Sequence, residues 1–460
     1  LDFQMMAPYI SPTGLRGGFH YQDAQTDDAR LVLRVMREAA GDGGTALNYV
    51  RAEQLLLDGA DRPVGLRLRD ILTGRSAEAH ARVIINATGA WADNLRVQVG
   101  EEARIRPLRG SHLIFPAWRF PLAQAVSFMH PIDGRPVFAF PWEGVTLVGT
   151  TDVDCPPPLE NDPSITGDEV AYLMAAITAH FPALSLTLSD VVATFAGIRP
   201  VIGSGKADPS DESRDHVIWQ ENGLLTVTGG KLTTFRQIAR QALEEVCHVI
   251  DDPDTEAGES RLARLHDDAP VLQAVDAHIA GIEALPGEVG QRLIGRYGLD
   301  APALLAAAGA DELEPVPGTP VLWAEIRWSA RAEAVAHLED LLLRRARLGL
   351  LLPHGGVDHL ARIRAIVQAE LGWDDARWAT EEANYRELIA TAYSLPPADT
   401  IPDWREMLAK TKVDRDAAEI IRQEQFRRAR RRAGWLTLAL GAILIIGWLL
   451  KRRGVEKIND

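Results

Sequence analysis

A strand that ends in two glycines and leads into a helix is the feature that most constrains this chain. The strand-like stretch is Leu224–Thr228, the glycines are Gly229 and Gly230, and the helix-like stretch begins at Lys231. Glycines let a ligand approach the backbone closely, and free N–H groups at a helix start favour an anion. Lys231 adds a full positive charge there. The pattern is typical of an α/β fold with an anion site, although an ordinary strand-to-helix turn has the same sequence.

Composition and periodicity divide the 460 residues into parts. Residues 1–250 alternate between strand-like and helix-like stretches, whereas 251–395 are rich in Ala, Leu, Glu and Arg and look helical throughout. We therefore predict an α/β domain over 1–250, a helical domain over 251–395, a linker and charged helix over 396–432, and a membrane anchor over 433–460.

Local patterns predict individual elements within these parts. Apolar residues fall on one helical face over Asp27–Ala40, for which Thr26 is a plausible cap. The turn-like pair Glu143-Gly144 separates two expected strands, Val137–Pro141 and Thr146–Thr150. Further along, Trp323–Leu352 is expected to be one long helical stretch.

Charge is unevenly distributed along the chain. The net charge of −15 argues against nucleic acid as a partner, because phosphate backbones bind basic surfaces. Residues 401–460 nevertheless hold 14 Lys and Arg against 8 Asp and Glu, and they include the uncharged, apolar stretch Trp435–Leu450 between two basic clusters. We expect this stretch to be a single carboxyl-terminal anchor that contacts membrane lipid and keeps the body at the cytoplasmic face of the cell membrane. A helix lying in the interface has the same pattern.

Cysteine usage indicates a reduced, metal-free protein. Only Cys155 and Cys247 occur, and they match no metal or redox spacing. We therefore expect two reduced structural cysteines and no metal site.

Four further short motifs contain candidate site residues. Arg199 lies between a glycine and a proline, a setting that suits a bidentate grip on phosphate, but a surface salt bridge is the commoner use of such an arginine. Arg214 precedes Asp215-His216, and His112 follows Arg109-Gly110-Ser111; each residue alone is more often structural. The segment Gly149–Asp152 follows an expected strand and also fits a simple turn.

The order of these motifs carries a resemblance to a known family. Asn86–Asp93 resembles the segment beside the adenosine half of FAD in the D-amino-acid-oxidase-like flavoprotein superfamily. With the motifs at 21–30, 109–112, 141–144, 149–152, 197–200, 213–216 and 229–235, the chain resembles the FAD-dependent glycerol-3-phosphate dehydrogenases over roughly residues 15–395. The resemblance implies an FAD- and substrate-binding domain with an antiparallel substrate sheet and a helical cap domain. It also implies oxidation of sn-glycerol 3-phosphate to dihydroxyacetone phosphate, with quinone as the electron acceptor and homodimers possible.

Carried over residue by residue, the resemblance assigns roles to the motifs. It implies that Arg199, Arg214 and Lys231 contact the substrate, and that His112, Arg199 and Lys231 act in catalysis, with His112 as the base that removes the C2 hydroxyl proton. The cofactor contacts that it implies are Ala87, Thr88, Gly89, Trp91, Gly149, Thr150, Asp152, Gly197, Gly230, Leu232 and Thr233.

One family motif is absent from the sequence. No G-x-G-x-x-G turn followed by a helix occurs, and this turn holds the pyrophosphate of FAD in the family. We therefore expect an amino-terminally incomplete Rossmann-like domain that lacks its first parallel strand and, expressed alone, retains little FAD. Two alternatives stay open: an oxidase that uses oxygen, and a non-catalytic remnant tethered to a membrane.

Overall fold

The structure is a computed structural model that describes residues 2–159, 162–203, 205, 212, 215–250, 282 and 285–413. Two compact units are present: one comprises 1–128 and 136–402, and the other comprises 129–135 and the chain from 403 onward. In the second unit, residues 404–413 form a helix. The elements discussed below belong to the first unit, apart from the last residue of one edge strand.

A six-stranded sheet positions most of the candidate site residues. Its order is β10-β5-β8-β7-β6, and β9 pairs with β5 beyond the end of β8. The pairs that join β5 to β8, β9 and β10, and β7 to β8, are antiparallel, as the resemblance implied. The bounds are β5 Ile105–Pro116, β6 Val126–Met129, β7 Pro136–Trp142, β8 Val145–Gly149, β9 Val153–Asp154 and β10 Ala193–Ile202.

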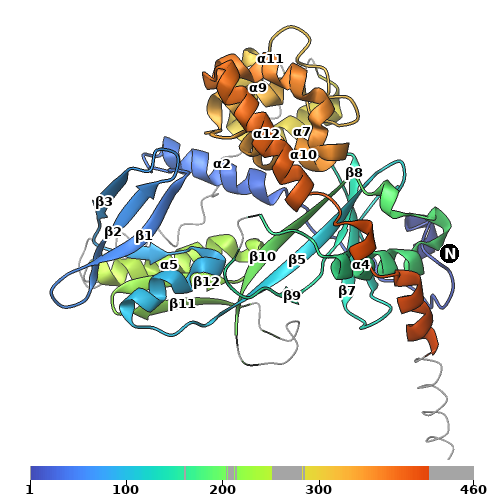
Figure 1. The fold of residues 1–460 in the computed structure, drawn as a ribbon, viewed down its shortest axis with the longest axis horizontal. Helices are drawn as coiled ribbons and strands as arrows, with labels where there is room; N and C mark the ends of the chain where they lie inside the picture. Colours follow the sequence, from blue (N-terminus) through green and yellow to red (C-terminus); the bar gives the residue numbers. More distant parts are fainter. Residues whose placement is uncertain are drawn as a thin grey trace, which may run out of the picture. The chain divides into compact units, whose positions relative to one another are not determined.

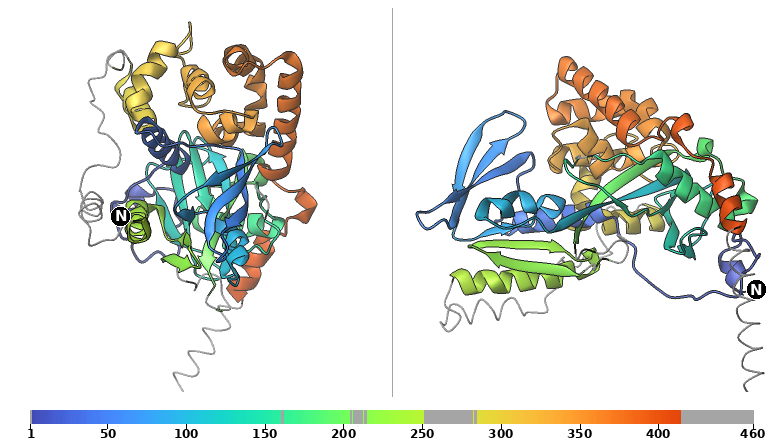
Figure 2. Two further views of the ribbon diagram at one scale, coloured as in Figure 1. Left: turned by 90° about the vertical axis from the view of Figure 1, so that its left-hand side faces the viewer. Right: turned by 60° about the horizontal axis from the view of Figure 1, so that its bottom comes forward.

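A smaller sheet has the order β11-β12-β4 and contains a parallel pair. Strand β12 (Leu224–Gly229) is parallel to β4 (Ile84–Asn86) and antiparallel to β11 (His216–Glu221). Helix α5 (Phe235–Ile250) follows β12 after the short 3-10 turn η6 (Leu232–Thr234) and lies along the β11–β12 hairpin (Figures 1 and 2). Because β4 and β12 are parallel, the segments that follow them leave the same edge of the sheet.

Hairpins and short helices complete the first 250 residues. A third sheet has the order β1-β2-β3, with both pairs antiparallel. The bounds are α1 Asp2–Met6, α2 Asp28–Gly41, β1 Val50–Leu57, β2 Pro63–Asp70, β3 Ser76–His80, η1 Gly89–Trp91, α3 Asp93–Arg96, η2 Val97–Val99, α4 Gly167–His180, η3 Pro182–Leu184 and η4 Leu188–Asp190.

The described residues between 285 and 402 are mainly helical, and helices of this part pack on the six-stranded sheet (Figure 1). One core cluster joins Ile114 of β5 and Leu147 of β8 to Trp323, Leu341 and Tyr385 of the helical part. The bounds are α7 Gly287–Tyr297, η8 Gly298–Asp300, α8 Ala301–Ala307, α9 Trp323–Ala332, a π-helical turn η9 Asp340–Arg345, α10 Leu348–Leu351, η10 Pro353–His359, α11 Leu360–Leu371, α12 Asp375–Ala392 and η11 Ala398–Thr400.

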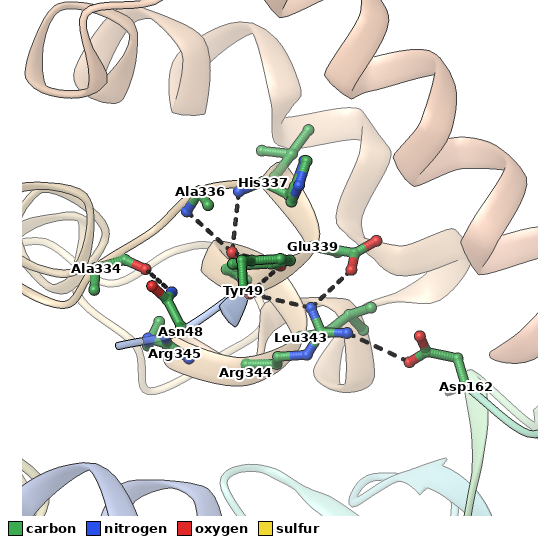
Figure 3. A network of polar contacts seen from close by, with 12 residues as sticks. Asn48, Tyr49, Asp162, Ala334, Ala336, His337, Glu339, Leu343, Arg344 and Arg345 are labelled. Carbon is green, nitrogen blue, oxygen red and sulfur yellow. Dashed lines mark hydrogen bonds and ion pairs between the residues drawn. The ribbon is translucent and has the colours of Figure 1, made fainter. Parts of the chain in front are cut away.

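Polar contacts tie the segment before β1 to the π-helical turn (Figure 3). The hydroxyl of Tyr49 donates to the carboxylate of Asp340 at 3.0 Å. That carboxylate also accepts from the backbone N–H groups of Ala336 and His337 at 3.0 Å and from Arg344 at 3.2 Å. Burial and the neighbouring Asp340 raise the pKa of Tyr49, so its hydroxyl keeps its proton.

Several local expectations hold and others are wrong. The two strands around Glu143-Gly144 are confirmed, and both cysteines are free. The residue that caps α2 is Asp27 rather than Thr26, and its side chain makes no capping bond. The stretch from Trp323 to Leu352 is not one helix, because the backbone takes left-handed dihedral angles at Ala334 (φ 50°) and Arg347 (φ 66°) and ends each helical segment.

The expected anchor over 433–460 and most of the expected charged helix over 396–432 lie outside the described residues. Among the residues that the structure does describe, none of the helices has the length and apolar character needed to cross a membrane. The domain boundaries stay predictions.

Candidate active site

The register of β5 and β10 places His112 and Arg199 on one face of the six-stranded sheet. Phe195 is paired with His112, Gly197 with Gly110, and Arg199 with Leu108. Side chains alternate between the two faces of a strand, so these three pairs lie on the same face. Between the histidine and the arginine this face carries only glycines, and a Cβ on Gly197 would meet no atom within 4 Å. The face is therefore open above Gly197, whereas the space above Gly110 is occupied by other side chains.

Within the described part of the chain, residues 150–152 hold the guanidinium of Arg199. Its NH1 group donates to Asp152 at 3.1 Å, and its NH2 group donates to the hydroxyl of Thr150 at 3.1 Å and to the carbonyl of Thr151 at 3.2 Å. The side chain crosses β5 over Gly110, where any Cβ would collide with it. Arg199 lies within strand β10 and not at its end. Pro200 is tolerated because β10 is the edge strand of the sheet.

His112 is held flat between two strands. Its ring stacks on Phe195 with 4.5 Å between the centroids and an angle of 5°. On the other side lies Gly149 of β8, where a Cβ would overlap the ring. Burial and the positive charge of Arg199 lower the pKa of His112 from 6.5 to about 4, so the imidazole is neutral at pH 7. Its buried Nδ1 atom has no hydrogen-bond partner among the described residues.

A buried carboxylate behind the site was not foreseen from the sequence. Glu169 of α4 is 3% exposed and accepts from Ser111, from Thr151 and, through an ion pair of 2.9 Å, from Arg109. The sequence signal was a capping box, since Thr166 precedes Glu169 by three residues at the start of an apolar helix. That pattern predicts the helix start but says nothing of the strands that the carboxylate contacts.

The ends of β4 and β12 form a second cluster of predicted residues. Asn86 is fully buried, donates to the carbonyl of Ala92 at 2.9 Å, and accepts from the Thr88 hydroxyl at 2.7 Å. After it, Gly89 takes a left-handed φ of 61° with no atom within 4 Å of a Cβ. The following turn, η1, contacts both β10 and β12. Along this edge the side chains of Ala87, Thr88, Trp91, Leu232 and Thr233 are exposed.

The glycine pair after β12 also adopts a special backbone. Gly229 and Gly230 have φ values of 74° and 79°, a region that side chains other than glycine rarely adopt. A Cβ on Gly230 would lie 2.7 Å from Ile238 and 3.0 Å from His216. The hydroxyl of Thr228, just before the pair, is buried without a partner among the described residues. The glycine turns with left-handed backbone and the unpartnered Thr228 hydroxyl fit the flavin that the resemblance implies.

Of the two remaining predicted cations, the structure describes only Lys231. Lys231 is exposed, and its carbonyl accepts from the N–H and hydroxyl of Thr234 at 3.1 Å. The α-helix begins at Phe235, four residues later than the lysine, because η6 intervenes. Arg214 lies outside the described residues. The structure therefore brings together His112, Arg199, Gly149, Thr150, Asp152 and Gly197, and it places the remaining described candidates at the ends of the parallel strands.

Two family models match successive parts of the chain. The family model of the FAD dependent oxidoreductases matches residues 2–236, and the model of the C-terminal domain of alpha-glycerophosphate oxidase matches residues 261–378. The chain is 40% identical over 255 residues to an aerobic glycerol-3-phosphate dehydrogenase of Bacillus subtilis, a match that covers 55% of this chain and 45% of the relative. It is 33% identical over 360 residues to the protein of that name from Staphylococcus aureus, with 74% of this chain and 63% of the relative covered.

The chain therefore spans about half to two thirds of the length of these curated relatives. A solved structure, the glycerol-3-phosphate dehydrogenase from Bacillus halodurans complexed with FAD, superposes with a TM-score of 0.68 at 28% identity. The match covers 85% of this chain and 78% of that one. The resemblance identified from the motifs is confirmed: the chain belongs to the family of FAD dependent oxidoreductases, as a relative of the glycerol-3-phosphate dehydrogenases.

Proposed function

We propose that this chain forms the substrate side of an enzyme that oxidises sn-glycerol 3-phosphate to dihydroxyacetone phosphate with FAD and passes the electrons to quinone. The observation that carries the proposal is that His112, which is neutral, and Arg199, which is fixed by hydrogen bonds, lie on one face of the sheet with two glycines between them. The names of the relatives supply the substrate class, and the family supplies the cofactor.

The base role goes to His112. Oxidation of an alcohol removes a hydride from carbon and a proton from oxygen, and an imidazole can accept that proton only in its neutral form. The lowered pKa keeps His112 neutral, and the unpartnered Nδ1 shows that the ring has hydrogen-bonding capacity to spare. When bound, FAD supplies the hydride acceptor.

The anion-binding role goes to Arg199, helped by Arg214 and Lys231. Asp152, Thr150 and the Thr151 carbonyl fix the plane of the Arg199 guanidinium, which reduces the entropy lost when it binds a phosphate or a developing alkoxide. A substrate dianion gives a reason for cationic side chains at its site in a chain of net charge −15. Lys231 and Arg214 are assigned from their motifs, since Lys231 is exposed and Arg214 lies outside the described residues.

The flavin-holding role goes to the turns at the two sheet edges. We assign the cofactor contacts to the residues that the family resemblance implies. Each is exposed, is a glycine, or forms a hydrogen bond with Arg199: Ala87, Thr88, Gly89, Trp91, Gly149, Thr150, Asp152, Gly197, Gly230, Leu232 and Thr233.

A glycerol-3-phosphate oxidase is the second candidate. The C-terminal match bears the name of an oxidase domain, whereas both curated relatives are named dehydrogenases. The two activities differ in the electron acceptor alone. We test them by measuring turnover of sn-glycerol 3-phosphate under argon with a ubiquinone analogue, and in air without it. Quinone-dependent turnover with little peroxide supports the dehydrogenase, and peroxide formation at the same rate supports the oxidase. No turnover with any acceptor in a flavin-loaded protein would leave the non-catalytic alternative.

We further propose that residues 433–450 hold the protein at the cytoplasmic face of a membrane. The support is the uncharged run Trp435–Leu450 between five arginines and Lys451-Arg452-Arg453. Carbonate extraction at high pH separates a spanning helix, which stays in the pellet, from an interfacial one, which is released. Sedimentation of the protein with membranes after removal of the residues from 427 onward would contradict the anchor.

A further inference from the structure

The turn that holds Arg199 lies at a gap in the ladder of the large sheet. Strand β8 pairs with β5 from Pro116 to His112 and then ends at Gly149. The ladder resumes where β9 pairs Val153 with Arg109. Between them, residues 150–152 turn away from β5, and the stretch of β5 opposite them, Gly110 and Ser111, has no strand partner on that side.

Side-chain hydrogen bonds fill that gap. The backbone N–H of Ser111 donates to the hydroxyl of Thr151 at 2.9 Å, in place of a strand carbonyl. The Thr151 hydroxyl donates in turn to Glu169 Oε1 at 2.6 Å, and the Ser111 hydroxyl donates to the same oxygen at 2.8 Å. The other carboxylate oxygen accepts from the N–H of Thr166 at 3.0 Å, from its hydroxyl at 2.9 Å and from Arg109 at 2.9 Å.

The carboxylate of Glu169 therefore anchors three separate elements. It lies at the start of α4, and five donors share its two oxygens. Burial opposes its charge, but the hydrogen bonds from Thr151, Thr166 and Ser111 and the cation of Arg109 hold the pKa of this carboxyl below its usual range. An ionised acceptor in the interior forms stronger hydrogen bonds than a neutral one, so it can fix the turn firmly.

We infer that Glu169 is a positioning residue for substrate binding: it holds Thr151 against β5, so that the Thr151 carbonyl and the adjacent Thr150 and Asp152 set the guanidinium of Arg199. This inference rests on the proposed function. It does not make Glu169 a catalytic residue, because its carboxylate contacts Arg199 only through the turn. Loss of this contact should raise KM and leave kcat nearly unchanged. The reason is that His112 lies on β5 where the strand is fully paired, so its position does not depend on residues 150–152.

The test compares four variants of the protein as its natural gene encodes it, each purified with its flavin bound. Glu169→Gln replaces one carboxylate oxygen by an NH2 group, which cannot accept the hydrogen bonds that this oxygen accepts. Thr151→Val replaces the hydroxyl by a methyl group and keeps the shape of the side chain. Thr151→Ser restores the hydroxyl. Glu325→Gln is the matched control, because Glu325 is a fully buried glutamate that caps α9 and has no contact with the site among the described residues.

We expect Glu169→Gln and Thr151→Val to raise KM for sn-glycerol 3-phosphate roughly tenfold or more and to change kcat by less than about threefold. Thr151→Ser should recover most of that loss, and Glu325→Gln should lower Tm without raising KM. Unchanged KM in folded, flavin-loaded Glu169→Gln and Thr151→Val would overturn the inference, and so would an equal rise in KM in Glu325→Gln.

A second readout does not depend on the substrate. Amide hydrogen exchange of the Ser111 N–H and of residues 150–153 should quicken in Glu169→Gln and in Thr151→Val, and remain as in the wild type in Glu325→Gln. Failure of the wild-type protein to use glycerol 3-phosphate would refute the proposed function, and the exchange rates would still decide the positioning role. Unchanged exchange in both site variants would refute that role.

Discussion

The guanidinium of Arg199 lies over Gly110, on the next strand, in space that any other residue at position 110 would fill. A Cβ on Gly110 would collide with the NH2 group of Arg199 and lie 3.0 Å from its Cζ atom. The position of Arg199 thus requires a glycine at 110. Because the colliding group is the end of a flexible side chain, a larger residue there should displace that side chain and leave the backbone unchanged.

Gly110→Ala should therefore impair substrate binding and spare the fold. Arg199 must leave Asp152 and Thr150, and losing charged hydrogen bonds costs about 1.5–3 kcal/mol, or roughly a ten- to hundredfold rise in KM. Thermal unfolding and steady-state kinetics measure the two effects. Gly59→Ala is the control, because its Cβ meets nothing within 4 Å. A normal KM in Gly110→Ala would show that the arrangement of Arg199 is irrelevant to binding.

His112→Asn should lower kcat by about a hundredfold or more and leave KM within a small factor, because a base acts mainly in the transition state. Folded His112 titrates at about 4 and the unfolded residue at 6.5, so the unfolded chain binds more protons between these values. The stability that this group contributes is complete above pH 6.5 and falls as pH drops towards 4. Unfolding measured across that window should show a weaker pH dependence in His112→Asn. An NMR titration that placed His112 near 6.5 would contradict this assignment.

Arg199→Ala and Lys231→Ala should each reduce kcat/KM roughly ten- to a hundredfold, by loss of about 1.5–3 kcal/mol of charged interaction. Arg199→Ala should also loosen the 150–152 turn, whereas Lys231→Ala should not, because Lys231 is exposed at the end of β12. Inorganic phosphate binding measured by calorimetry separates lost anion contacts from lost catalysis. Wild-type affinity and kinetics in either variant would remove that residue from the site.

Tyr49→Phe should destabilise the protein without affecting the site. The hydroxyl of Tyr49 contributes one of the donors to the buried Asp340, and its loss should cost about 1–3 kcal/mol of unfolding free energy. Tyr21→Phe serves as the control, because Tyr21 is 64% exposed. Denaturant unfolding measures both variants. Equal stability of the two would mean that the contact in Figure 3 contributes nothing measurable.

Turns and site motifs could be predicted from the sequence where a residue type has a strong conformational preference. The Glu143-Gly144 turn could be predicted because glycine readily adopts a positive φ, here 88°, and the strand before Gly229-Gly230 is confirmed as β12. The parallel pairing of β12 with β4 was not predicted. His112, Arg199 and the Gly149–Asp152 turn were recognised as separate motifs, and the strand register brings them together.

Prediction failed where tertiary contacts override local preference. Gly197 and Pro200 disfavour a strand, yet β10 continues through both because Pro200 lies on an edge strand and faces Pro107. The breaks after Trp323 arise from left-handed Ala334 and Arg347, neither of which has a local sequence signal. Glu169 was overlooked for the same reason, since its partners Ser111 and Thr151 are 58 and 18 residues away.

The proposed reaction is oxidation of sn-glycerol 3-phosphate with FAD at the sheet face that carries His112 and Arg199. The most direct measurement is anaerobic mixing of the flavin-loaded protein with this substrate, followed by the absorbance of the oxidised flavin. We predict full bleaching by sn-glycerol 3-phosphate, a slower reaction when deuterium replaces the hydrogen on C2, and strongly slowed bleaching in His112→Asn. A flavin that stays oxidised in the presence of saturating sn-glycerol 3-phosphate would contradict the account.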